Sequence, residues 1–244
     1  EFIKKYDGVE GFKIYGNDRY IYQYISDNYP EDQIKFDISK INLVTIDIEV
    51  ASENGFPDVE SAAEEMLLIT IQDYNTKNII TWGVGPFLNK QKNVEYRQFS
   101  SEHGMLNDFI HYWMNNTPEI VTGLVTEVEV YIMGRKQISY DIGGITQLDY
   151  LDLYKKFTYT NQESYRLDHI ANVELGQKKL DHSEFDTFKD FYSKGWQKFV
   201  EYNIIDVELV DRLEDKMKLI ELALTMAYDA KVNYSDVFYQ VRIF

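Results

Sequence analysis

Residues 43 to 50 read LVTIDIEV, a short apolar stretch interrupted by two acids, Asp47 and Glu49. Successive side chains of a β-strand point to opposite faces, so the alternation predicts a strand with both acids on one face. The stretch is apolar enough for a central strand, and two like charges so close together repel each other unless a cation lies between them. A divalent metal bound by both carboxylates explains the pattern. A strand end whose acids face water explains it equally well.

The overall charge of the chain permits such a metal site. The 244 residues include 41 acidic and 25 basic side chains, which gives a formal net charge of −16. This charge argues against a free-standing protein that grips nucleic acid by neutralising phosphates. It is compatible with a site where bound metals supply the positive charge, or with a fragment of a larger protein that carries its basic surfaces elsewhere. The absence of cysteine excludes disulfide scaffolds and thiolate zinc sites.

The hydrophobic pattern places most strands before most helices and predicts a layered α/β or α+β fold. No apolar run is long enough to predict a membrane span, so no membrane partner is expected. Strands are expected at residues 41–50, 66–74, 78–84, 94–99, 118–123 and 145–154, and helices at about 101–116, 164–173 and 185–230, the last with a break near Gly195.

Two segments of the chain stand apart from this pattern. Residues 127–132 and 137–142 both alternate and flank Met133-Gly-Arg-Lys136, which predicts a β-hairpin whose mixed polarity suits projection from the sheet. Residues 1–40 are too few to fold alone and are interpreted as the end of a preceding domain. A domain boundary is therefore expected between residues 40 and 41.

A second pair of functional side chains lies in the last long helix. Tyr202 and Asp206 are four residues apart and so share a helical face. An acid on a mostly apolar helix needs a partner, unless it caps a local hydrogen bond or faces solvent. Together with the strand acids, this pair suggests a two-metal phosphodiester site. Asp47 is the expected bridging ligand, Glu49 and Asp206 complete one metal, and Tyr202 orients the attacking water.

These motifs resemble a known family. Asp47-Ile-Glu49 on an opening strand, followed by Tyr202-x-x-x-Asp206 on a late helix, resembles the proofreading 3′→5′ exonuclease domain of family B DNA polymerases, of the DnaQ-like, DEDDy type. Further segments resemble the tailed-bacteriophage branch of that family, namely Asn54-Gly-Phe-Pro57, Leu148-Asp-Tyr-Leu-Asp-Leu-Tyr-Lys-Lys-Phe157, Thr160-Asn-Gln162, Ser164-Tyr165 and Tyr202-Asn-Ile-Ile-Asp-Val207. The resemblance covers residues 41–244. It implies a ribonuclease H-like fold, with a mixed central β-sheet flanked by helices and a projecting β-hairpin.

The resemblance also implies a chemistry. It assigns Asp47, Glu49 and Asp206 as ligands of two divalent metals, Mg²⁺ or Mn²⁺, and Tyr202 as the residue that orients water. The implied substrate is the 3′ end of single-stranded DNA. Phe56 is expected to stack on a base near that end, although a loop aromatic that covers the core would look the same.

The hairpin is expected to help separate primer from template. Met133, Gly134 and Arg135 at its tip then approach DNA, whereas the alternative is an ordinary extension of the sheet.

One part of the family pattern is missing. The family carries a further Asp, on a segment like Trp-Asn-x-x-x-Phe-Asp, between the opening strand and the hairpin. Here Thr122-Gly123 resembles the residues just before that motif, but Leu124 already resembles the approach to the hairpin. Either the segment has been deleted, or the sequence omits residues that the protein carries, which we favour. An intact mass above that of 244 residues would distinguish the two, and no residue is nominated as the fourth carboxylate.

The leading hypothesis is an exonuclease that belongs to a replicative DNA polymerase. Its expected partners are the polymerase domain of the parent chain and replication accessory proteins, in the cytoplasm of an infected bacterium if the origin is a phage. Polymerase palm motifs are absent. Two alternatives remain: an inert module of the same fold that binds single-stranded DNA or the polymerase body, and a free-standing nuclease, against which the hairpin and residues 1–40 argue.

Overall fold

The computed structural model describes residues 24, 27–29, 35–52, 63–123, 127–132, 135–139 and 145–238 of the chain. Within these residues, a sheet of six strands has the order β4-β3-β2-β1-β5-β8. Its strands are β1 (Leu43–Val50), β2 (Met66–Asp73), β3 (Ile79–Gly83), β4 (Val94–Gln98), β5 (Ile120–Gly123) and β8 (Thr146–Gln147). Strand β1 runs antiparallel to β2 and parallel to β5, so the sheet is mixed. The predicted α/β fold of the ribonuclease H-like type, with helices flanking a mixed sheet, is confirmed.

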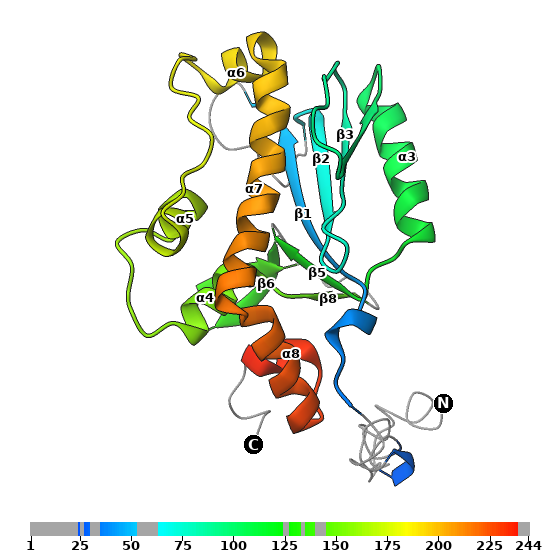
Figure 1. Ribbon diagram of the computed structural model, residues 1–244, viewed down its shortest axis with the longest axis vertical. Coiled ribbons are helices and arrows are strands. Elements are labelled where there is room, and N and C mark those ends of the chain that lie inside the picture. Colours follow the sequence, from blue (N-terminus) through cyan, green and yellow to red (C-terminus); the bar gives the residue numbers. More distant parts are fainter. Residues whose placement is uncertain are drawn as a thin grey trace, which may run out of the picture.

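Helices cover both faces of this sheet. They are α3 (Glu102–Asn115), α4 (Tyr150–Phe157), α5 (Leu167–Leu175), α6 (Phe188–Lys194), α7 (Trp196–Met217) and α8 (Leu219–Ala230), with short 3₁₀ turns η1 (Ile38–Lys40) and η2 (Tyr234–Phe238). Figure 1 shows α7 running beside β1, with α3 on the other side of the sheet. None of the described helices is long and apolar enough to cross a membrane.

The alternation of β1 decides which helix its acids meet. Val44, Ile46 and Ile48 belong to the apolar cluster that packs under α3. The side chains between them point to the opposite face, where α7 contacts β1, β2 and β3. The predicted separation of the two faces is therefore confirmed, and Asp47 and Glu49 lie between the sheet and α7.

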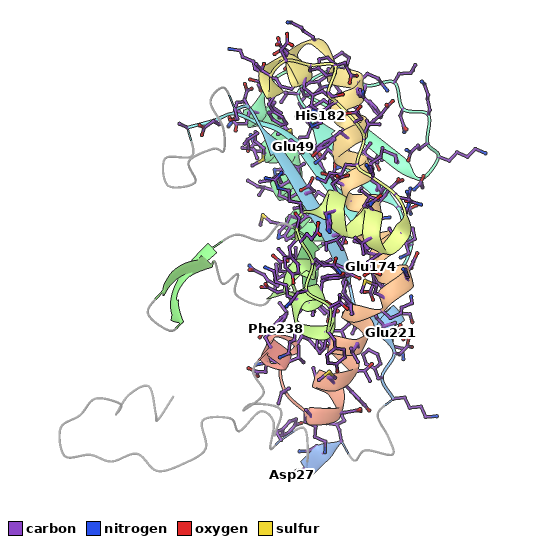
Figure 2. All side chains as sticks on the ribbon, turned by 90° about the vertical axis from the view of Figure 1, so that its left-hand side faces the viewer. Asp27, Glu49, Glu174, His182, Glu221 and Phe238 are labelled. Atoms are coloured by element: carbon purple, nitrogen blue, oxygen red, sulfur yellow. The ribbon has the colours of Figure 1, made fainter. Side chains whose placement is uncertain are left out.

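The hairpin prediction is also confirmed. Strands β6 (Glu127–Ile132) and β7 (Arg135–Ser139) pair antiparallel as a separate two-stranded sheet, which projects from the body in Figure 2. The second strand starts at Arg135, two residues before the expected position.

The strand predicted for residues 145–154 is wrong. Only Thr146–Gln147 are extended, and α4 begins at Tyr150. The Asp149 carboxylate accepts a hydrogen bond of 2.7 Å from the Leu151 amide and so caps the first turn of the helix. Tyr150, Leu153 and Tyr154 are buried at helical spacing. The sequence ITQLDYLDLY fits either period, and the cap favours the helix.

The long helix predicted for residues 185–230 is interrupted twice. It breaks at Gly195, as expected, and again at Lys218, which has φ 56° in the left-handed region. At the second break, the buried Glu214 carboxylate accepts hydrogen bonds from the amides of Ile220 (3.0 Å) and Glu221 (3.2 Å). A side chain of α7 thus satisfies the free N–H groups at the start of α8.

Replacing Glu214 by alanine is expected to lower the free energy of unfolding by about 1–3 kcal/mol, because one buried and one partly buried amide lose their acceptor. Urea denaturation followed by circular dichroism measures this loss. Glu221→Ala, which keeps the capping carboxylate of Glu214, is the matched control and should change stability much less. Equal losses in the two variants would contradict the capping role.

Candidate metal centre

Three carboxylates from two distant elements meet between the sheet and α7. Asp47 and Glu49 come from β1, and Asp206 comes from the middle of α7. Each offers one carboxylate oxygen, and these oxygens all lie within 4.8 Å of one another. Figure 2 labels Glu49 on β1, beside α7. The structure therefore brings together the three acids that the sequence nominates as metal ligands.

The electrostatics of this cluster favour a bound cation. Burial, followed by the charge of Asp206, raises the pKa of Asp47 to about 7. Burial and the charges of Asp47 and Asp206 raise the pKa of Glu49 to about 8. Burial also raises the pKa of Asp206, although the nearby Lys179 offsets part of this effect. Each acid is therefore harder to ionise than in water, and a divalent cation would relieve that cost.

One oxygen of the cluster has no partner at all within the described part of the chain. Asp206 is only 6% exposed, and its Oδ1 atom is buried without a hydrogen bond. A buried carboxylate oxygen without a donor is costly unless something else supplies positive charge. Carboxylate oxygens are the ligands that Mg²⁺ and Mn²⁺ prefer. The residues present therefore fit a divalent metal.

Lys179 is part of the site, although the sequence pattern does not single it out. It lies in the irregular segment between α5 and α6, and its ammonium donates hydrogen bonds to Asp206 Oδ2 and, at 3.1 Å, to the Tyr202 hydroxyl. Burial by itself lowers the pKa of Lys179, but Asp206 and Tyr202 raise it overall, so the ammonium stays charged. No periodic signal marks Lys179, whose neighbour Lys178 is the same residue type.

Asn203 is a second residue that the sequence pattern misses. It is fully buried, and its Nδ2 donates a hydrogen bond of 2.7 Å to Asp47 Oδ2. Its Oδ1 accepts a hydrogen bond from the Thr70 hydroxyl, which is 2.9 Å from that of Thr81. The spacing could have indicated Asn203, because residues three apart share a helical face and Asn203 precedes Asp206 by three. The amide fixes the orientation of the Asp47 carboxylate.

Tyr202 points its hydroxyl into the same cluster and is held there by aromatic neighbours. Its ring meets His182 and Phe191 edge to face, with centroid distances of 5.6 and 5.7 Å. Lys179 lies 5.0 Å from the ring centroid. Burial, followed by the charge of Asp206, raises the pKa of Tyr202 to about 12. The hydroxyl is therefore neutral at physiological pH and acts as a hydrogen-bonding group, not as a base.

The remaining nominated residues stay predictions. Phe56, Met133 and Gly134 lie outside the described residues, and Arg135 is described only as the first residue of β7, without its side chain. No fourth carboxylate joins the cluster among the residues that the structure describes.

Comparisons with known proteins all find similarity to DNA polymerases. Residues 15–124 match the family model described as DNA polymerase family B, exonuclease domain. The chain is 29% identical to the DNA-directed DNA polymerase of Escherichia phage RB69, over 299 aligned positions that cover 99% of this chain and 33% of that protein. It is 28% identical to the DNA-directed DNA polymerase of Enterobacteria phage T4, with the same coverage. The chain therefore spans about a third of the length of these curated relatives.

The comparisons also bear on the length of the chain. The alignments run over 299 and 298 positions, whereas this chain has 244 residues, so the relatives carry residues that have no counterpart here. The match to the family model ends at residue 124. The expectation that a segment of the family is missing between β5 and the hairpin stays a prediction.

Proposed function

The chain belongs with the exonuclease domains of phage family B DNA polymerases, and from this premise we propose that it is a metal-dependent 3′→5′ exonuclease acting on single-stranded DNA. The observation that carries the proposal is the convergence of Asp47, Glu49 and Asp206, together with the unpartnered Oδ1 of Asp206. A proofreading role in DNA replication follows from the polymerase relatives.

The residues of the site have different roles in the proposed hydrolysis. Asp47, Glu49 and Asp206 would hold a divalent cation, which would supply the positive charge that polarises a scissile phosphate and activates water. Asn203 holds the Asp47 carboxylate in place through the hydrogen bond to Oδ2. Lys179 is a fixed positive charge close to the reacting phosphate.

Tyr202 has a separate role. Its hydroxyl accepts a hydrogen bond from Lys179 and keeps its own proton, which it can donate to the attacking water. This orients the water and requires no ionisation of the phenol.

The substrate and partners follow from the same premise. Phe56 stacks on a base near the 3′ end, and stacking accepts any base because every base has a π-face. Met133, Gly134 and Arg135 of the hairpin approach the junction of primer and template. The enzyme works beside a polymerase domain and its accessory proteins, inside the infected bacterium. The chain covers about a third of the length of each relative, so these partners are part of the proposal.

A second candidate function is an inert module of the same fold that binds single-stranded DNA without cleaving it. The specific observation in its favour is that the described residues contain only three clustered carboxylates.

A single assay separates the two candidates. The purified chain is incubated with a 5′-labelled single-stranded oligonucleotide in Mg²⁺, in Mn²⁺ and in EDTA. We expect a ladder of products shortened from the 3′ end, formed with either metal and absent in EDTA. An oligonucleotide with a terminal phosphorothioate linkage is the control and should shorten more slowly. Retarded migration without shortening in both metals would favour the inert module.

A further inference from the structure

We propose that Thr70 and Thr81 are positioning residues of the metal centre. Through Asn203, they hold the Asp47 carboxylate in the orientation that binds a divalent cation. The inference rests on the proposed function and deepens it, because it names residues of the same site that never touch the metal.

The two threonines and Asp47 form one row across three neighbouring strands. Asp47 of β1 lies opposite Thr70 of β2, and Thr70 lies opposite Thr81 of β3. Residues directly opposite each other on neighbouring strands project to the same face of a sheet. Since Asp47 faces α7, both threonines face α7 as well, and that helix supplies Asn203 (Figure 1). The register of the sheet therefore aligns the row with the amide that reaches Asp47.

The hydrogen bonds along this row have one direction. An ionised carboxylate can only accept, so Asn203 turns its Nδ2 toward Asp47 Oδ2 and its Oδ1 toward Thr70. The Thr70 hydroxyl has a single proton, which it donates to Asn203 Oδ1. Its oxygen is then the acceptor for the Thr81 hydroxyl, 2.9 Å away. The four side chains thus form a chain of donors that begins at Thr81 and ends on the carboxylate.

Burial makes this chain of donors the only use of the two hydroxyls. Thr70, Thr81 and Asn203 are all 0% exposed. A valine would suit the same strand positions and fill nearly the same space, whereas a buried hydroxyl is costly unless it is hydrogen-bonded. Within the described part of the chain, the two hydroxyls bond to each other and to Asn203 alone. Their contribution is therefore to the group that Asn203 holds.

The consequence of this arrangement is a metal ligand that is oriented in advance. The hydrogen bond from Thr70 keeps the Asn203 amide from turning, since a turned amide would place its oxygen against the Asp47 carboxylate. With Oδ2 held, the carboxylate loses less conformational freedom when a cation binds. Residues that orient metal ligands typically change metal affinity or activity by about 10- to 100-fold when they are replaced.

Binding of Mn²⁺ tests the proposal without an activity assay. Free Mn²⁺ gives a sharp electron paramagnetic resonance signal that weakens on binding, so a titration of the purified chain at about 0.15 M salt, which screens surface charge, gives the affinity. The double variant Asp47→Asn, Glu49→Gln supplies the background from surface acids. Thr70→Val removes the hydroxyl at nearly constant shape, and we expect Mn²⁺ binding to weaken by about 10- to 100-fold. Thr81→Val leaves Thr70 able to donate and should weaken binding less.

Two control variants separate orientation of the ligand from general loss of stability. Thr70→Ser keeps the donor and should bind Mn²⁺ like the parent protein. Thr225→Val removes a hydroxyl that donates to the Glu221 carbonyl at 2.8 Å, in α8 beyond the end of α7 (Figure 1). This variant should also bind Mn²⁺ like the parent. Circular dichroism establishes that each variant is folded.

A double variant tests whether Thr70 acts through Asn203. Asn203→Leu removes the amide and keeps the bulk, and we expect it to weaken Mn²⁺ binding at least as much as Thr70→Val does. Adding Thr70→Val to Asn203→Leu should then cause no further loss, because the group that Thr70 orients is already gone. Two independent effects on the structure would multiply instead. If Thr70→Val does not fold, Thr81→Val alone and combined with Asn203→Leu decides in the same way.

The outcomes separate this inference from the proposed function. Parent-like Mn²⁺ affinity in Thr70→Val, a loss that Thr70→Ser shares, or losses that multiply with Asn203→Leu would overturn the inference. A metal-dependent product ladder from the parent protein beside any of these results would leave the proposed function intact. The expected losses of affinity without a ladder from the parent would uphold the positioning role and refute the nuclease. Absence of site-specific Mn²⁺ binding in the parent, together with absence of the ladder, would refute both.

Discussion

Replacing Asp47 by asparagine is expected to lower the rate of metal-dependent nucleotide release on the order of 10³-fold or more. The change removes a charged ligand from the centre of the cluster, and the electrostatic contribution of a bound metal is worth several kcal/mol, with about 1.4 kcal/mol for each factor of ten in rate. Release of nucleotides from a labelled single-stranded oligonucleotide, measured at saturating Mg²⁺, gives the ratio of rates.

Thermal melting tests whether the Asp47→Asn variant is folded. The pKa of Asp47 is raised to about 7, above its ordinary value, so its stabilising contribution is present in acid and lost as the pH rises through about 7 without metal. An asparagine does not titrate and can keep the hydrogen bond from Asn203 through its amide oxygen. At pH 8 in EDTA, the variant should therefore melt no earlier than the parent protein. A folded variant that retains full activity would contradict the assignment of Asp47 as a metal ligand.

The second large effect is expected from Tyr202→Phe. Removing a group that positions the attacking water lowers the rate by about 10²-fold, at the lower end of what proton-handling side chains contribute. The phenyl ring keeps its contacts with His182 and Phe191, so the fold and the metal site remain. We expect kcat to fall while the affinity for DNA and for Mn²⁺ stays close to that of the parent protein.

The control for Tyr202 is a residue of the same type on a different surface. Tyr159 is fully exposed in the loop between α4 and α5 and makes no contact with the three acids. Tyr159→Phe should leave the rate constant unchanged. A rate in Tyr202→Phe equal to that of the parent would show that the hydroxyl takes no part in the reaction.

The elements that follow from local pattern are those the sequence predicts well. Strand β1 is predicted to the residue at its C-terminal end, because apolar and polar side chains alternate without interruption. Helix α3 is predicted to within one residue at each end, and the hydroxyl of Ser101 caps it by accepting a hydrogen bond from the Gly104 amide. Residues 145–154 are predicted wrongly because their pattern fits two periods. The helix is selected by the Asp149 cap, a local contact over two residues, and by the burial of Tyr150, Leu153 and Tyr154.

The residues of the site also divide into those that local pattern predicts and those that it does not. Asp47 and Glu49 can be nominated from spacing because they share one face of a strand. Asp206 can be nominated because it shares one face of a helix with Tyr202. Lys179 and Asn203 reach the site only through tertiary packing. Asn203 meets Asp47 across 156 positions of sequence, and Lys179 comes from a segment without periodicity. Local pattern carries no information about such contacts.

The distance along the chain between β1 and α7 has a consequence for biosynthesis. A ribosome completes β1 long before it reaches Asp206, so for most of the synthesis Asp47 and Glu49 have no third acid to share a cation with. Contacts that are far apart in sequence form late, after the loop between them has closed. A nascent or truncated chain that ends before α7 therefore holds two acids but no nuclease. Under the proposed function, only molecules whose helix α7 has docked would be able to cleave DNA.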